Sequence, residues 1–144
     1  MATDRTAEVT WHGSLTEGAG TIDRVGSGAF GPLDVTWASR AEEPAGRTSP
    51  EELIAAAHAA CFSMAFSHQL AQNGTPPDEL ETSATVTFVP GTGITKSALT
   101  VRARVPGIDE ATFLEKAAAA KSGCPVSQAL AGVPEITLDA TLAQ

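Results

Sequence analysis

Alternation of apolar and polar residues over the first third of the chain predicts short β-strands. Residues 8–12 alternate weakly, and residues 33–37 (Leu-Asp-Val-Thr-Trp) alternate as a half-buried strand does. Glycine-rich stretches at 18–20 and 26–31 punctuate this region like hairpin turns. The pattern therefore predicts a meander of about three strands within the first 40 residues, followed by a loop over 42–48.

A long helix is predicted for residues 49–72. Ser49 suits the N-cap, and Pro50 suits the first helical position. Two glutamates follow in the first turn, where they complement the helix dipole, and Glu52 has the spacing from Ser49 of a capping box. Asn73-Gly74 is a normal signal for the end of a helix.

The middle of this helix is apolar nearly all round, so we expect it to be buried on most sides. A small domain cannot easily surround such a helix alone. A homodimer that shares its central helices would supply the missing cover.

The second half of the chain predicts a hairpin, two helices and a last strand. Residues 82–89 and 95–105 are β-rich and alternate, and the turn between them holds proline and two glycines. Helices are predicted for 109–122, capped by Asp109, and for 125–130, and a strand for 136–142. This order describes an α+β fold in a single domain over residues 1–144.

Composition and charge narrow the classes of function. The net charge is −8, which argues against nucleic acid and anionic membranes as partners because phosphate binding needs an excess of lysine and arginine. Residues 53–70 include histidine and serine among the apolar residues, so they predict a core helix and not a membrane span. The N-terminus lacks the pattern of a secretory signal, which favours a cytoplasmic location.

The chain has two cysteines in contrasting settings. Cys124 lies between Gly123 and Pro125 at the start of a predicted helix, where exposed N–H groups and the helix dipole favour a thiolate. Cys61 lies inside the apolar helix, where burial makes a thiol inert unless a cation reaches it. Inside a cell such cysteines are more often catalytic or redox-sensing than structural. The simpler alternatives are a small residue at a tight turn for Cys124 and a packing residue for Cys61.

Other chemistry finds little support in the sequence. His58 and His68 share the long helix but have no acidic residue at a ligand spacing, so a structural or exposed role is the better interpretation. A phosphate-binding loop, a dinucleotide fingerprint and a nucleophile elbow are all missing from the sequence. We therefore expect neither a metal nor a cofactor.

Two motifs carry a resemblance to a known family. Residues 49–65, which end in His58-Ala59-Ala60-Cys61-Phe62-Ser63-Met64-Ala65, closely resemble the central-helix signature of the OsmC/Ohr hydroperoxide peroxidases. Residues 121–127, around Gly123-Cys124-Pro125, resemble the second-cysteine motif of that family, and 105–109 and 135–138 resemble its OsmC branch. The resemblance covers essentially the whole chain in the right order.

The resemblance implies a fold and a set of roles. The fold would have antiparallel sheets wrapped around long central helices in an intertwined homodimer, with sites at the subunit interface. Cys61 matches the peroxidatic cysteine, and Cys124 matches the resolving cysteine that forms a disulfide with it. Glu51 matches the family's glutamate and Arg40 its arginine, with Arg47 as the alternative. The implied reductant is a dithiol of lipoyl type or a small thiol.

Physical reasoning limits how these residues work together. Glu51 and Cys61 are ten residues apart on one helix, or about 15 Å along its axis, so they cannot touch directly. Either the arginine bridges them or Glu51 acts across the dimer. Glu51 would hold the guanidinium through a bidentate pair, and the arginine would lower the pKa of Cys61. An apolar wall, expected from Phe62, Met64 and Phe66 together with residues of the partner subunit, would favour organic hydroperoxides over hydrogen peroxide.

The sequence thus predicts a cofactor-free, cysteine-based peroxidase of organic hydroperoxides, which the family resemblance connects with oxidative and osmotic stress. Two alternatives stay open. One is a redox sensor that forms the same disulfide without sustained turnover, and the other is a homodimer that binds an apolar ligand and in which the cysteines are incidental.

Overall fold

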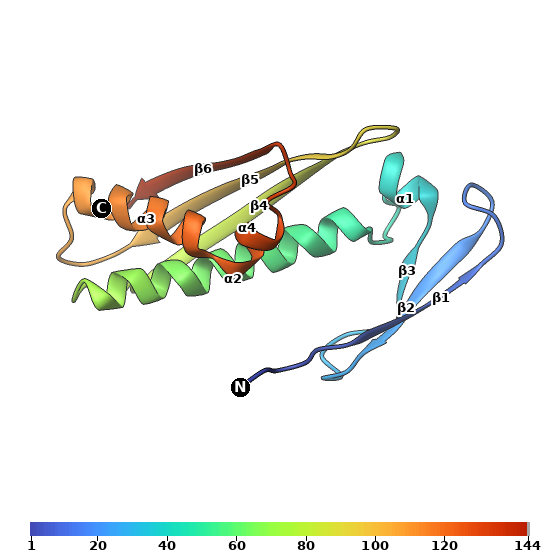
Figure 1. Cartoon of the computed structure of the whole chain (residues 1–144), viewed down its shortest axis with the longest axis horizontal. Helices are drawn as coiled ribbons and strands as arrows, with labels where there is room; N and C mark the ends of the chain where they lie inside the picture. The colour runs from blue at the N-terminus through green and yellow to red at the C-terminus, as the bar shows by residue number, and fades with distance from the viewer. Residues whose placement is uncertain (144) are drawn as a thin grey trace. The chain divides into compact units, whose positions relative to one another are not determined.

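The computed structural model of the chain describes residues 1–143, and its strands form two three-stranded sheets (Figure 1). The residues group into two units that divide inside the longest helix, one over Met1–Leu53 and one from Ile54 onward. The α+β class is confirmed. The prediction of a single domain over residues 1–144 stays a prediction.

The first unit contains the predicted meander. Strands β1 (Ala7–His12), β2 (Ala19–Val25) and β3 (Leu33–Val35) pair in sequence order, and both pairs are antiparallel. Gly20 pairs with Trp11 across β1 and β2, and a Cβ atom at Gly20 would meet the Trp11 ring. A glycine here therefore lets the indole ring lie flat against the neighbouring strand.

Helix α1 (Trp37–Ala41) begins at the last residue of the strand predicted for 33–37 and ends before the loop predicted for 42–48. A capping box starts it: the Ser39 N–H donates to Thr36 Oγ1 at 3.0 Å, and the Thr36 N–H donates to Ser39 Oγ at 2.9 Å. The strand prediction through Trp37 is wrong because five residues are too few for a helical period, which leaves the cap as the main signal. The helix places Arg40 in its last turn.

Helix α2 (Pro50–Gln72) matches its predicted bounds. The Glu52 N–H donates to Ser49 Oγ at 3.1 Å, which confirms the N-cap. The Glu52 carboxylate accepts a hydrogen bond from Thr48 Oγ1 at 2.8 Å, so it ties down the preceding loop. The helix ends before Gly74, which has a φ of 80°, a conformation that glycine adopts at little cost.

Within one chain, α2 is buried along one face only. Its side chains at His58, Phe62, Phe66 and Leu70 are fully buried, while Ala56, Ala60 and Met64 on the opposite face are exposed. One chain therefore covers only one side of the helix, and the expectation that a homodimer buries the other side stays a prediction. The helices of the described residues include none long and apolar enough to cross a membrane.

The second sheet is mixed and not purely antiparallel. Strands β4 (Glu79–Val89) and β5 (Gly93–Arg104) form the predicted hairpin, but β6 (Glu135–Leu142) joins β5 in parallel. The reason is the connection between β5 and β6, which consists of α3 (Glu110–Gly123) and α4 (Pro125–Ala129). A helical crossover of this length returns the chain to the end of the sheet at which β5 began, so β6 runs parallel to β5.

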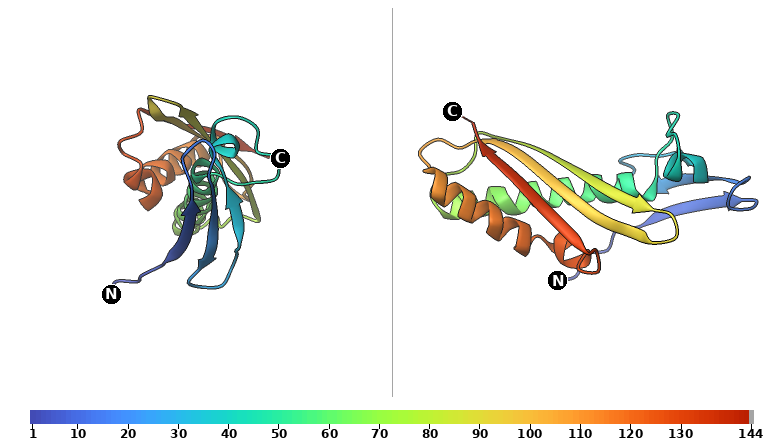
Figure 2. Two further views of the ribbon diagram at one scale, coloured as in Figure 1. Left: turned by 90° about the vertical axis from the view of Figure 1, so that its right-hand side faces the viewer. Right: turned by 90° about the horizontal axis from the view of Figure 1, so that it is seen from above.

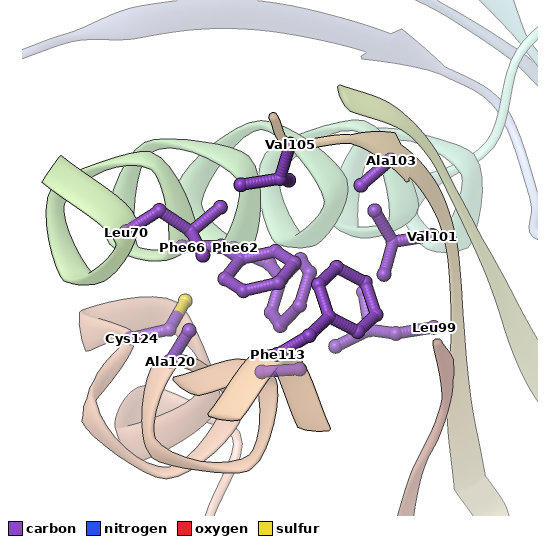
Figure 3. Packing of buried hydrophobic residues seen from close by; sticks show 11 residues of the cluster. Phe62, Phe66, Leu70, Leu99, Val101, Ala103, Val105, Phe113, Ala120 and Cys124 are labelled. Atoms are coloured by element: carbon purple, nitrogen blue, oxygen red, sulfur yellow. The ribbon is translucent and has the colours of Figure 1, made fainter. Parts of the chain in front are cut away.

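Helices α2 and α3 lie on the same face of this sheet (Figures 1 and 2). Between them and β5 is a core in which Phe66 stacks at a tilt against both Phe62 and Phe113, with ring centroids 5.5 and 5.4 Å apart (Figure 3). Such aromatic pairs add directional contacts to the burial of apolar area. The core therefore fixes where α2 lies relative to α3 and α4, which are the elements that carry the two cysteines.

Candidate functional site

Cys124 occupies the junction between α3 and α4. Its backbone N–H donates to the Ala120 carbonyl at 2.9 Å and closes α3, while its own carbonyl accepts from the Gln128 N–H at 3.1 Å and opens α4. Pro125 then takes the first position of α4, where its missing N–H costs nothing. The side chain of Cys124 is fully buried and points toward α2 (Figure 3).

The two cysteines meet although 63 residues separate them in the sequence. Cys61 on α2 and Cys124 lie near enough for each to shift the pKa of the other, and the Val126 backbone N–H also acts on Cys61. Both cysteines are reduced, and Cys61 is the more accessible of the two. The fold therefore brings the two cysteines together, as a disulfide between them would require.

The two thiols differ in acidity. Burial by itself raises the pKa of Cys124, but the nearby Cys61 thiol and the groups of Ser127 and Val126 lower it overall. Burial raises the pKa of Cys61, and the nearby Cys124 raises it further, against a smaller opposing effect of Val126. Within this unit, the surroundings of the two thiols therefore shift their pKa values in opposite directions.

Arg40 and Glu51 form the bidentate ion pair that the sequence predicted. Arg40 Nε donates to Glu51 Oε1 at 3.0 Å, and Arg40 Nη2 donates to Glu51 Oε2 at 2.9 Å. The Glu51 side chain is only 7% exposed, whereas that of Arg40 is 32% exposed. The carboxylate thus fixes a guanidinium that keeps part of its surface available. Arg47, the alternative, lies exposed in the loop before α2.

Arg40 and Glu51 belong to the first unit, and the cysteines belong to the second. The prediction that the arginine acts on Cys61 therefore stays a prediction.

His58 is a component of the site whose place the sequence interpretation left open between a structural and an exposed one. The structure buries it completely, with Nδ1 2.7 Å from Ser97 Oγ and Nε2 2.8 Å from Ser127 Oγ. Ser127 also contributes to the lowered pKa of Cys124, so one hydroxyl lies between the histidine and the thiol pair. A signal was available: His58 precedes Cys61 by three residues, and Ser127 follows Cys124 by three, so each pair shares a helix face.

The expected apolar wall is only partly present. Phe62 and Phe66 are fully buried in the core and pack against Phe113, so their assignment to a substrate pocket is wrong. They follow the buried face of α2, whereas Met64 lies on the opposite face and is 75% exposed. Met64 borders an open groove of about 550 Å³ between α2 and the start of β4, together with Ser63, Ser67 and Leu80.

Metal chemistry has no candidate centre in this part of the chain. Across residues 1–143, histidine, cysteine, aspartate and glutamate side chains do not gather in groups of three that could hold a metal ion. His58 uses both ring nitrogens for serine hydroxyls, so neither is available as a ligand.

Comparison with known proteins extends the sequence resemblance. A family model described as OsmC-like protein matches residues 43–139. The chain is 43% identical over 142 residues to the protein named peroxiredoxin OsmC of Escherichia coli (strain K12), with 96% of each chain covered. It has the same identity and coverage with the protein of that name from Shigella flexneri.

Solved structures share the fold. The organic hydroperoxide resistance protein OhrB of Bacillus subtilis is 27% identical, with a TM-score of 0.62 over 96% of this chain and 98% of that one. An OsmC-like protein from Mycoplasma pneumoniae has a TM-score of 0.70 at 19% identity, and the match covers 99% of this chain and 100% of the other.

The neutral, buried state of His58 predicts a dependence of stability on pH. Burial lowers the pKa of His58 in the folded protein. At a pH below about 6.5, the usual pKa of histidine, His58 binds a proton in the unfolded chain but stays neutral in the folded chain. The contribution of neutral His58 to the free energy of unfolding is therefore fully present above that pH. It is lost as the pH falls below it, by at most about 1.4 kcal/mol per pH unit. Urea unfolding of the wild type between pH 5 and 7.5 measures this slope.

His58→Gln should flatten the slope, because the titrating group is gone. His68→Gln is the matched control, since His68 lies exposed on the same helix, and it should keep the wild-type slope. Parallel curves for the wild type and His58→Gln would contradict the assignment.

Proposed function

The chain belongs to the OsmC-like protein family, and on that premise we propose that it is a cysteine-based peroxidase that reduces organic hydroperoxides to alcohols. The observation that carries the proposal is that the fold places Cys61 and Cys124 near enough for each thiol to shift the pKa of the other. Two sulfurs in contact can store and return a pair of electrons without a cofactor. The names of the relatives from Escherichia coli and Bacillus subtilis support this class of activity and substrate.

The proposed reaction has three steps. In the first step, the Cys61 thiolate attacks the distal peroxide oxygen. An S–O bond forms, the O–O bond breaks, and the alkoxide takes a proton from solvent to become the alcohol. In the second, the Cys124 sulfur attacks the Cys61 sulfenic acid, so that an S–S bond forms and hydroxide leaves with the proton of the Cys124 thiol as water. In the third, a dithiol reductant of lipoyl type, or a small thiol, supplies two electrons and restores both thiols.

The order of the two cysteines requires a cation at Cys61. Burial raises the pKa of Cys61, so this thiol is a poor nucleophile in its own surroundings. A guanidinium beside it would lower that pKa and could donate a hydrogen bond to the peroxide oxygen. We assign this part to Arg40, because Glu51 holds its fork in one orientation while about a third of the side chain stays accessible.

A homodimer completes the proposal. The exposed face of α2 carries a central apolar stripe, Ala56, Ala60 and Met64, at helical spacing. Small residues in such a stripe would let a second α2 approach closely. Glu51 lies about 15 Å along the helix axis from Cys61 of the same chain, which favours an arrangement where Arg40 and Glu51 of one subunit serve Cys61 of the other. A cytoplasmic location and a single domain over residues 1–144 belong to the same proposal.

A redox sensor is the second candidate, and a specific observation favours it. The described surroundings make Cys124, and not Cys61, the more acidic thiol. A cysteine pair whose peroxidatic thiol is mostly protonated would form its disulfide slowly. Slow formation is compatible with a redox sensor, but it is too slow for an efficient enzyme.

Turnover of the purified protein separates the two candidates. With dihydrolipoamide as reductant, we expect sustained consumption of cumene hydroperoxide and slower consumption of hydrogen peroxide. Cys61→Ser should abolish turnover, because the attacking sulfur is lost. The matched variant Cys124→Ser should consume about one equivalent of peroxide and then stall, because the sulfenic acid finds no partner. Full turnover by Cys61→Ser would refute these roles, and a disulfide that forms without sustained turnover would indicate the sensor.

Replacement of the arginine tests the cation. Arg40→Ala should slow the attack of Cys61 on the peroxide about a hundredfold, because a donor that stabilises the developing charge is lost. The same variant should raise the pKa of Cys61. Arg47→Ala, the control in the adjacent loop, should stay within about twofold of the wild type. Stopped-flow measurement of single-turnover sulfenic acid formation gives both rates. A slow Arg47→Ala with a normal Arg40→Ala would transfer the role to Arg47.

Mixed dimers test whether the site is shared between subunits. By itself, Cys61→Ser should be inactive, and Arg40→Ala should keep only about a hundredth of the wild-type rate. If Arg40 serves the partner's thiol, an equal mixture after subunit exchange contains heterodimers with one complete site, and it recovers about a quarter of wild-type activity. If Arg40 serves the thiol of its own chain, each heterodimer has no complete site and the mixture stays inactive. Sedimentation at the assay concentration confirms that dimers are present.

A further inference from the structure

A buried chain of polar groups lies beside Cys124. It runs from Ser97 on β5 through His58 on α2 to Ser127 on α4. Ser127 follows Cys124 by three residues at the start of α4 and contributes to the lowered pKa of the Cys124 thiol. We propose that Ser127, oriented by His58, is a positioning residue that holds Cys124 ready for disulfide formation with the oxidised Cys61. This inference rests on the proposed function, because it assigns a device to the second step of that reaction.

The burial of these groups leaves them few alternatives. Ser97 and His58 are fully buried and Ser127 is 8% exposed, so the three form their hydrogen bonds with one another and with the protein around them. Among the described residues, each buried side-chain nitrogen and oxygen has a hydrogen-bond partner. A fully satisfied buried network is rigid, and it therefore sets the direction in which each hydroxyl points.

The tautomer of His58 decides what Ser127 can do. A neutral imidazole has one donor nitrogen and one acceptor nitrogen. When the proton lies on Nε2, His58 donates to Ser127 Oγ, and the Ser127 hydroxyl proton is free to point at Cys124. The Ser97 hydroxyl then donates to Nδ1. In this arrangement Ser127 donates to a sulfur anion, which lowers the pKa of Cys124, and the imidazole itself stays uncharged.

The position of Ser127 suits the second step. Cys124 must form the S–S bond with Cys61 while the S–O bond of the sulfenic acid breaks and hydroxide leaves with the proton that Cys124 releases. The groups that act on the Cys124 thiol are the Cys61 thiol from α2 and the Ser127 and Val126 groups of α4. The rest of its surroundings are apolar core, including Ala120 and Phe66. Ser127 is therefore the side-chain hydroxyl that can stabilise the anion there.

Single-turnover oxidation without reductant tests the proposal. Peroxide is added in equal amount to the reduced protein, and rapid acid quench with mass spectrometry follows the sulfenic acid and the disulfide. Ser127→Ala should leave sulfenic acid formation within about twofold of the wild type and slow disulfide formation about tenfold, the loss of one hydrogen bond to an anion. Ser127→Thr keeps the hydroxyl and should restore most of that rate.

Ser97→Ala is the matched control. It removes the other hydrogen-bond partner of His58 but no group at the sulfur, so a merely structural role would make the two alanine variants equal. We expect disulfide formation in Ser97→Ala within about threefold of the wild type. A wild-type rate in Ser127→Ala, or equal slowing in both variants, would overturn the proposal.

Two measurements on the Cys61→Ser background do not depend on peroxidase activity. There, the pH midpoint for alkylation of Cys124 should move upward by about one pH unit when Ser127 becomes alanine. Nitrogen-15 NMR of the histidine rings, with Ser127 intact, should show the proton of His58 on Nε2 above that midpoint. An unchanged midpoint, or a proton on Nδ1, would overturn the role of Ser127 even if the protein proves to be an efficient peroxidase. Failure of wild-type turnover with these two results intact would overturn the proposed function alone.

Discussion

The contact between Cys61 and Cys124 is the interaction on which the proposed chemistry depends. It exists because the chain breaks its helical course at Cys124, where α3 ends and α4 begins. The aromatic core of Phe62, Phe66 and Phe113 holds α2 against that break. Packed interiors resist changes of volume, so the packing of this core helps to determine how near the two cysteines lie to each other.

Two thiols in one buried contact cannot both ionise, because like charges at this distance repel strongly where water is excluded. The protein therefore has to divide its electrostatic support. In the second unit, Val126 and Ser127 act on Cys124 and lower its pKa. In the proposed mechanism, the guanidinium of Arg40, which Glu51 holds, supports Cys61. The proposed reaction begins at Cys61 and ends at Cys124, and it needs this division because each sulfur must be an anion in its own step.

Periodicity in the sequence predicted the long elements well, because α2, β4 and β5 repeat their pattern over many residues. Periodicity failed where an element was only a few residues long, or where its pairing depended on residues distant in the sequence. Helix α1 is too short to show a period, and the parallel pairing of β6 follows from the crossover before it. The apolar composition of α2 indicated that its own chain could not surround it, but it could not tell which face stays uncovered. The predicted Arg40–Glu51 pair is present, whereas the roles of both residues await experiment.

The His58 network shows why a buried histidine beside a redox pair calls for an explanation beyond stability. A neutral imidazole in an apolar core loses its hydration, and its hydrogen bonds to Ser97 and Ser127 only offset that loss. Apolar residues of similar volume would fill the same space without any polar group to satisfy, and such replacements are often neutral or stabilising. The network adds little stability, but it controls the direction of the Ser127 hydroxyl. Its presence is therefore better explained by the group that this hydroxyl faces. It faces Cys124, whose sulfur must be oriented and ionised when the sulfenic acid forms at Cys61.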